Sequence, residues 1–144
     1  MAFIFIFAIL VMFSMVNANK DGYETCKRYT TRLDTLLINV NWDAPKPDDI
    51  YIKFHTQWDF ANNYTTETTM LSFIISTFDY ENPWTTDSIF NDFTPGQNKI
   101  SRWDKVGIIH GLTFLNYSIT VLLSDDHYVF GCIYYDRRDS WWLL

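Results

Sequence analysis

Residues 113–135 read TFLNYSITVLLSDDHYVFGCIYY, and this stretch decides the fold class. Apolar side chains recur at every second position over 115–123, with mainly polar residues between them. A period of two is typical of a strand that buries one face. The turn-forming run at 124–127 is followed by a second apolar stretch at 128–135. The segment therefore predicts two antiparallel strands joined as a hairpin.

Strand patterns continue upstream of this hairpin. Apolar and polar residues alternate over 33–42, 50–58 and 105–110, whereas 69–80 is apolar on both faces and indicates a central strand. The segment 87–99 has no regular period and is expected to be irregular. No segment has the pattern of a convincing helix. We therefore expect an all-β domain, built as a single antiparallel β-barrel, with a β-sandwich as the alternative.

Composition and motifs exclude several classes of function. The 144 residues suit one domain, and their net charge of −6 disfavours nucleic-acid binding, because phosphates require a basic face. The sequence contains no nucleophile elbow, no His-Glu-x-x-His motif and no glycine-rich phosphate loop, so we predict neither enzymatic activity nor a cofactor. Only Asp125-Asp126-His127 resembles a metal-binding cluster. We interpret it as a polar turn and predict no metal site.

The first residues have the features of a secretory signal peptide. Residues 1–18 (MAFIFIFAILVMFSMVNA) are uncharged, and they end in Val16-Asn17-Ala18, a pattern typical of a cleavage site. The apolar run is short for a membrane span, which needs about 20 residues, and an uncleaved anchor is the alternative. No later segment is apolar enough to cross a bilayer. We expect a secreted, extracellular protein without a membrane partner, whose single β domain covers 19–144.

Secretion affects how the two cysteines are interpreted. An oxidising compartment would pair Cys26 with Cys132, and the alternative is two free thiols or one catalytic thiol. Glycosylation sequons at Asn63 and Asn116 support secretion. Asn116 falls on the polar side of the strand predicted at 113–123, where a glycan could be attached.

The C-terminal hairpin resembles that of a known family. Residues 117–126 (YSITVLLSDD) lead into a strand that carries Cys132, followed by Ile133-Tyr134-Tyr135, a charged turn and Trp141. This arrangement is similar to the late barrel hairpin of the tick salivary lipocalins, the group that includes the histamine-binding proteins. The resemblance implies a lipocalin-like barrel, complete or truncated. It also implies a salivary protein that sequesters a host mediator, a biogenic amine or a lipid, without catalysis.

Aromatic residues are the most suggestive feature of the chain, which has 12 Phe, 9 Tyr and 6 Trp. In a barrel, inward-facing aromatic rings could line a cavity and bind a cationic amine through cation–π contacts. The alternative is that they form ordinary core. The candidate ligand-binding residues, which share predicted inward positions, are Trp42, Phe54, Trp58, His110, Tyr117 and Tyr128.

A second hypothesis places binding on the surface. The chain ends in Ser-Trp-Trp-Leu-Leu, and an extended conformation would leave either Trp141 or Trp142 exposed. An exposed Trp/Leu patch is typical of a protein-binding surface. In this case the protein would be a secreted interaction module for a host macromolecule, such as an immunoglobulin or another immune protein.

Overall fold

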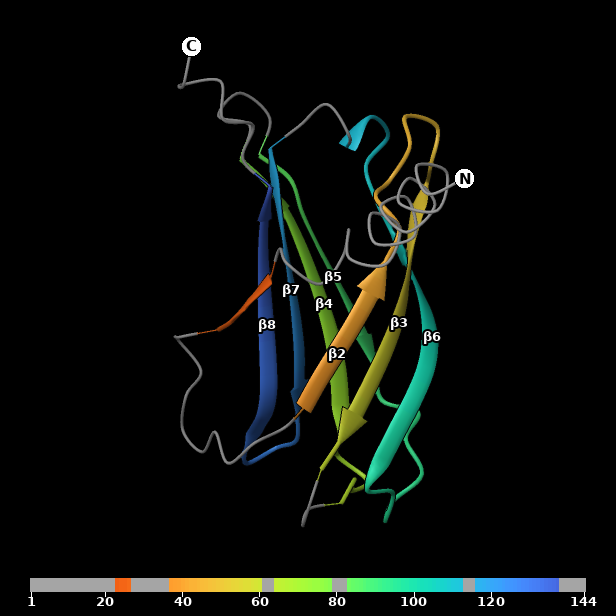
Figure 1. Ribbon diagram of the computed structural model, residues 1–144, viewed down its shortest axis with the longest axis vertical. Coiled ribbons are helices and arrows are strands. Elements are labelled where there is room, and N and C mark those ends of the chain that lie inside the picture. The colour runs from red at the N-terminus through yellow and green to blue at the C-terminus, as the bar shows by residue number, and fades with distance from the viewer. Residues whose placement is uncertain (1–22, 27–36, 61–63, 79–82, 113–115, 138–144) are drawn as a thin grey trace, which may run out of the picture.

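The computed structural model describes residues 23–26, 37–60, 64–78, 83–112 and 116–137. The predicted signal peptide and the two terminal tryptophans lie outside these residues. Eight strands are assigned, and no α-helix is assigned in the described ranges (Figure 1). The strands are β1 (Tyr23–Thr25), β2 (Leu37–Trp42), β3 (Tyr51–Asp59), β4 (Met70–Thr77), β5 (Thr85–Phe90), β6 (Lys99–Gly107), β7 (Tyr117–Ser124) and β8 (Val129–Arg137).

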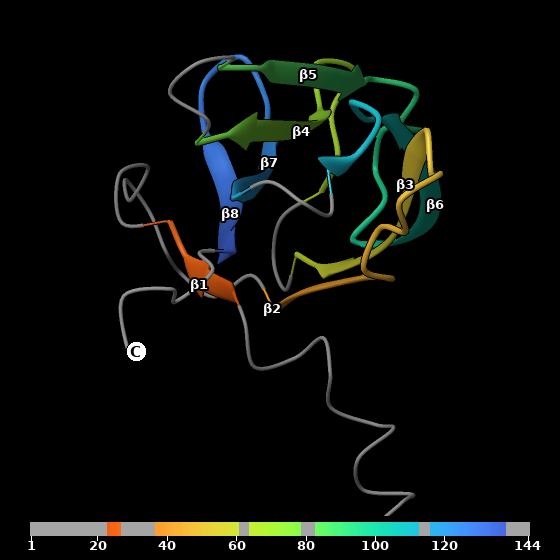
Figure 2. The same cartoon turned by 90° about the horizontal axis from the view of Figure 1, so that it is seen from above.

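These strands form two antiparallel sheets. One sheet has the order β1-β8-β7-β4-β5, and the other has the order β2-β3-β6. Figure 2 shows the two sheets arranged around a shared interior. The prediction of an all-β fold is therefore confirmed. Among the described strands no ladder joins the two sheets into a closed barrel, so the predicted single barrel is not confirmed and the arrangement is sandwich-like.

The C-terminal hairpin has the form that its sequence predicts. Strand β7 pairs with β8 along its whole length. The turn between them is held by Asp125, whose Oδ1 accepts hydrogen bonds from the backbone N–H groups of His127 at 2.8 Å and Tyr128 at 2.7 Å. Aspartate is favoured at this position because its side chain can bond to the backbone of the turn that follows it. The acidic run is thus a structural turn.

The sequence prediction fails between residues 85 and 110. The stretch 87–99, expected to be irregular, contains most of β5 and the start of β6. The strand expected at 105–110 is instead the end of β6, which stops at Gly107. Strand β6 is hard to recognise because Arg102 and Asp104 occupy its inner face, where the pattern requires apolar residues. Strand β5 lies at a sheet edge and alternates only between exposed and half-buried residues.

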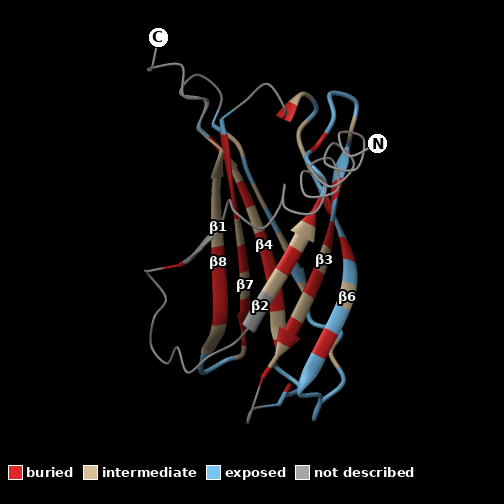
Figure 3. Ribbon diagram, viewed as in Figure 1, coloured by how far each residue is buried: buried red, intermediate tan, exposed pale blue. Residues whose placement is uncertain are grey.

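Aromatic and aliphatic side chains fill the space between the sheets, and Figure 3 shows buried residues along the strands of both sheets. Phe54 of β3 packs on Phe73 of β4 with the ring centroids 4.6 Å apart, which joins internal strands of the two sheets. Where β2 runs beside β8, Trp42 meets Tyr135 edge to face at 5.2 Å. Such pairs contribute about 0.5–1.5 kcal/mol beyond the area that they bury. The aromatic residues of the sequence thus connect the two sheets across the core and along one side.

The opposite side of the sandwich is closed by a charged cluster centred on Arg102 of β6. The Arg102 Nε donates to both carboxylate oxygens of Asp104, at 3.1 and 2.9 Å, and its Nη1 donates to Asp92 at 2.9 Å. Its guanidinium also lies over the rings of Phe90 and Phe93, 5.4 and 4.9 Å from their centroids. Phe90 is the last residue of β5, and Asp92 and Phe93 follow it in the chain. The Arg102 side chain therefore links β6 to the edge of the other sheet.

The two aspartates of this cluster differ in burial. The Asp104 side chain is only 3% exposed, whereas that of Asp92 is 74% exposed. The side-chain hydrogen bond from Arg102 lowers the pKa of Asp92. Burial acts to lower the pKa of Arg102, but its bonds with Asp104 and Asp92 outweigh burial and raise that pKa. The guanidinium therefore stays charged inside the sandwich.

We predict that Asp104→Ala lowers the free energy of unfolding by about 3 kcal/mol, because it leaves the mostly buried Arg102 without its main partner. Asp92→Ala is the matched control. It removes an exposed partner of the same guanidinium and should cost less than about 1 kcal/mol. Urea unfolding followed by tryptophan fluorescence measures both values. Equal losses for the two variants would contradict the difference in burial.

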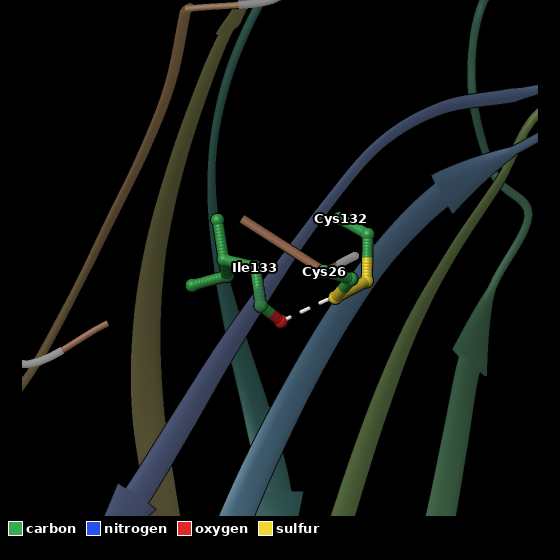
Figure 4. The surroundings of a disulfide bond; sticks show 3 residues. All are labelled: Cys26, Cys132 and Ile133. Carbon is green, nitrogen blue, oxygen red and sulfur yellow. Dashed lines mark hydrogen bonds between the residues drawn. A yellow bond between two sulfur atoms is a disulfide. The ribbon is translucent and has the colours of Figure 1, made fainter. Parts of the chain in front are cut away.

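A disulfide bond fixes β1 to the edge of the larger sheet. Cys26 and Cys132 are bonded with their Cα atoms 5.3 Å apart, which confirms the predicted pairing (Figure 4). The backbone N–H of Cys26 also donates to the Cys132 carbonyl at 3.1 Å, and Thr25 lies opposite Ile133 in the ladder. The bond joins residues 106 positions apart, and the loop that it closes contains β2 to β7 and the start of β8. It therefore constrains nearly the whole unfolded domain.

We predict that the double variant Cys26→Ser/Cys132→Ser is less stable than the wild type by about 4 kcal/mol, because closing a loop of this length removes entropy from the unfolded chain. Guanidinium unfolding of both proteins without reductant gives the difference. The single variant Ile133→Val, a small truncation at a neighbouring buried position, should cost only about 1 kcal/mol. If the double variant lost no more stability than Ile133→Val, the loop-closure account would be wrong.

Candidate functional site

Four of the six candidate ligand-binding residues lie in the core. Trp42, Phe54, Trp58 and Tyr117 are all buried, as the strand patterns predict. Trp42 packs on Phe54 with ring centroids 5.8 Å apart, and both belong to one continuous apolar cluster. The Arg137 guanidinium lies 5.7 Å from the centroid of the Tyr117 ring, and burial raises the pKa of that phenol. These rings contact other side chains, as in an ordinary core.

The other two candidates lie on the surface. His110 follows the end of β6 and is exposed, so its expected inward orientation is wrong. The expectation extended the alternation of β6 past Gly107, but the chain leaves the strand there and turns at Gly111, whose φ is +79°. Tyr128 is 52% exposed, because it lies in the turn before β8, where the strand alternation does not apply.

Of the two glycosylation sequons, only the one at Asn116 lies within the described residues. Asn116 is exposed and directly precedes β7, which is compatible with an attached glycan. Its carbonyl accepts a hydrogen bond from the backbone N–H of Phe78 at 2.8 Å. Asn63 lies outside the described residues.

The interior also holds two buried polar atoms that have no hydrogen-bond partner among the described residues. They are Oγ1 of Thr56 and Nε1 of Trp58, both on the inner face of β3. A buried group without a partner costs about 1–3 kcal/mol. Trp58 Nε1 can only donate a hydrogen bond. A molecule bound beside it would therefore have to offer an acceptor, such as a carbonyl or a carboxylate.

The outer face of sheet β2-β3-β6 has a different character. Along β3 and β6, buried residues alternate with exposed and half-buried ones (Figure 3). The exposed and half-buried positions therefore form the face that points away from the core. We call the group around its aromatic rings the strip, and it consists of Tyr51, Lys53, His55, Trp103 and Lys105. This surface was not predicted from the sequence, because the strand expected at 105–110 includes only the last three residues of β6. Alternation around Trp103 was the available signal, and the charged residues of the inner face obscured it.

Trp103 is the most exposed aromatic side chain of the strip. It is 70% exposed, and it lies directly opposite His55 in the β3–β6 ladder. The two rings are stacked with centroids 4.4 Å apart and an interplanar angle of 6°. His55 Nε2 also shares a hydrogen bond with Ser101 Oγ at 3.1 Å. The indole ring of Trp103 therefore lies flat against the His55 ring and remains largely exposed to solvent.

Two lysines flank the aromatic ring at the end of the strip. Lys53 and Lys105 lie directly opposite each other in the ladder, and both are exposed. Their ammonium groups lie 6.0 and 5.0 Å from the centroid of the Tyr51 ring. Among the described residues neither lysine forms an ion pair. Like charges directly opposite each other destabilise a sheet, so this pair carries an energetic cost.

The rest of the outer face is polar and slightly hollowed. Asn41 Nδ2 donates to Asn39 Oδ1, and Asn39 Nδ2 donates to Gln57 Oε1, each at 3.3 Å. An open hollow of about 340 Å³ lies over this end of the sheet. It is lined by the polar residues Asn39, Gln57, Asp59, Lys99 and Ser101, with Trp58 and Ile100 between them. Amide, hydroxyl, carboxylate and ammonium groups thus meet beside the strip.

No group of three or more metal-ligating side chains occurs among the described residues. In the same part of the chain no helix is long and apolar enough to span a membrane. No protein-family model matches the sequence, and no curated protein matches it. The resemblance to the tick salivary lipocalins stays a prediction.

We predict that Lys53→Glu raises the free energy of unfolding by about 0.5–1 kcal/mol, because it replaces a cross-strand repulsion with an attraction. Lys53→Gln is the matched control, and its stability should lie between those of the wild type and Lys53→Glu. Both changes leave Lys105 over the Tyr51 ring. Thermal or urea unfolding at low salt measures the three proteins. A lower stability for Lys53→Glu would show that the two lysines do not repel each other.

Proposed function

We propose that this chain is a secreted, non-enzymatic binding protein that holds a macromolecular ligand on the outer face of sheet β2-β3-β6. The apolar leader at 1–18 supports secretion, and the Cys26–Cys132 disulfide and the exposed sequon at Asn116 are compatible with it. This binding surface differs from the two binding sites predicted from the sequence, which were a cavity inside a barrel and the tryptophans near the C-terminus.

The exposure of Trp103 carries this proposal. Aromatic side chains bury 150–250 Å² each, roughly, and dominate the energetics of interfaces. Tryptophan is enriched among the residues that contribute most to binding. Trp103 is 70% exposed, and stacking on His55 limits the freedom that its ring would lose on binding. A surface of this kind suits the capture of a large ligand better than enclosure of a small one.

A small-ligand carrier is the second candidate, and the unpartnered atoms of Thr56 and Trp58 favour it. Trp58 Nε1 is a donor, so it would pair with the carboxylate of a fatty acid and not with the ammonium of a biogenic amine. The aromatic contacts of the core favour the first candidate, because they occupy the interior positions expected to line a cavity.

We predict that Trp103→Ala weakens ligand binding by more than about 30-fold, as expected for a central tryptophan of an interface. The experiment probes a glycan array and purified plasma proteins, including immunoglobulin, with the secreted protein and its variant. Tyr128→Ala is the matched control, because it removes an exposed aromatic ring from the β7–β8 turn of the other sheet. Circular dichroism checks that both variants are folded.

Three outcomes are informative. A ligand lost by Trp103→Ala and kept by Tyr128→Ala supports the outer face. A ligand that both variants bind like the wild type contradicts the proposal. Saturable calorimetric binding of a fatty acid, histamine or serotonin that is unchanged in Trp103→Ala also contradicts it and favours the interior.

A further inference from the structure

The charge of the outer face contrasts with that of the chain. The net charge of the protein is −6, whereas the described side chains of this face include three lysines and one aspartate. Lys99 is paired with Asp59 at 3.2 Å, whereas the adjacent Lys53 and Lys105 have no ion-pair partner within the described part of the chain. An anionic group between these two ammonium groups would replace repulsion with attraction on both sides.

The aromatic rings restrict what can carry this anion. On β6, Trp103 lies two residues from Lys105 on the same face, a separation of about 7 Å along a strand. The face of an indole ring has a negative electrostatic potential, which attracts the weakly positive C–H groups of a sugar ring. An acidic sugar could place its anionic group at the lysines and an adjacent ring against Trp103. A purely apolar ligand would leave both lysines unused.

The polar residues beyond Trp103 are also suited to binding a carbohydrate. Asn39, Gln57 and Ser101 offer amide and hydroxyl groups, each able to donate and to accept hydrogen bonds. Hydroxyl groups of a carbohydrate also do both. The Lys53/Lys105 and Asp59/Lys99 pairs are separated by six residues of strand, about 20 Å. The face therefore offers a few positive charges interspersed with neutral polar groups over an extended length.

We propose that the ligand of this face is an acidic carbohydrate, whose sulfate or carboxylate group lies between Lys53 and Lys105 while a sugar ring stacks on Trp103. This assignment rests on the proposed function of the outer face. A uniformly charged polyanion such as nucleic acid suits the site less well. Asp48 and Asp49 precede β3 and border the strip at one end, and most of the other polar groups are neutral.

The test is calorimetric titration of the secreted full chain with three oligosaccharides of similar length. A heparin fragment supplies sulfate and carboxylate, a hyaluronan fragment supplies carboxylate alone, and a maltose-series fragment is neutral. We expect saturable binding of at least one acidic fragment, weaker binding at higher salt, and no binding of the neutral fragment. A comparison of the two acidic fragments identifies the anionic group.

Variants test whether binding uses the strip. Lys53→Gln/Lys105→Gln should weaken binding of the acidic fragment about tenfold, and Trp103→Ala should weaken it more than about 30-fold. Lys46→Gln is the matched control, because it removes an exposed lysine from the loop before β3 and should leave the affinity unchanged. Equal losses in Lys46→Gln and the double variant would indicate a general charge effect and overturn the assignment.

The remaining outcomes separate this inference from the proposed function. If neither acidic fragment binds but a plasma protein binds in a Trp103-dependent manner, the carbohydrate assignment is wrong and the outer face remains the binding surface. If an acidic fragment binds and Trp103→Ala has no effect, the assignment is also overturned. If no ligand of any class depends on Trp103, both proposals fail.

Discussion

The contact between Phe54 and Phe73 is the constraint on which the rest of the structure depends. The two rings lie 4.6 Å apart and come from internal strands of opposite sheets, so they fix which side of each strand faces the core. Because side chains alternate along a strand, burying Phe54 forces Lys53 and His55 to the outside. A shift of β3 by one residue would reverse every side chain and destroy both the core and the strip. The surface proposed to bind ligand is therefore determined by the packing beneath it.

The two sides of the sandwich are closed in different ways. Beside β2 and β8 the contact is aromatic, between Trp42 and Tyr135. Beside β5 and β6 it is ionic, because Arg102 binds Asp104 within its own strand and Asp92 after β5. Ionic closure is directional, since a guanidinium holds a carboxylate in a defined orientation. The ladder with β3 positions β6, the strand that presents Trp103, and the bond from Arg102 to Asp92 links this strand to the segment after β5.

Prediction from sequence succeeded where one face of a strand was mainly apolar. Strands β3, β4, β7 and β8 show this pattern, and the disulfide followed from the cysteine count and the leader. It failed at β6, where two charged residues face inward, and at β5, an edge strand of mainly polar residues. The positions of His110 and Tyr128 could not be predicted by alternation, since both lie beyond the ends of strands. The His55–Trp103 stack depends on the pairing of β3 with β6, whose paired residues are at least 40 positions apart in the sequence. A local sequence pattern does not encode pairing over such a distance.

The inward charges of β6 have a consequence for the behaviour of the protein at high concentration. Within the described chain β6 pairs with β3 on one side only, so its other side presents backbone groups that a strand from a second molecule could bind. An added strand would have to pack beside Arg102 and Asp104, and it would disturb bonds that already satisfy both charges. Inward-pointing charges are one of the devices by which natural sheets resist edge-to-edge aggregation. The cluster that made β6 difficult to recognise in the sequence thus also protects its edge against self-association.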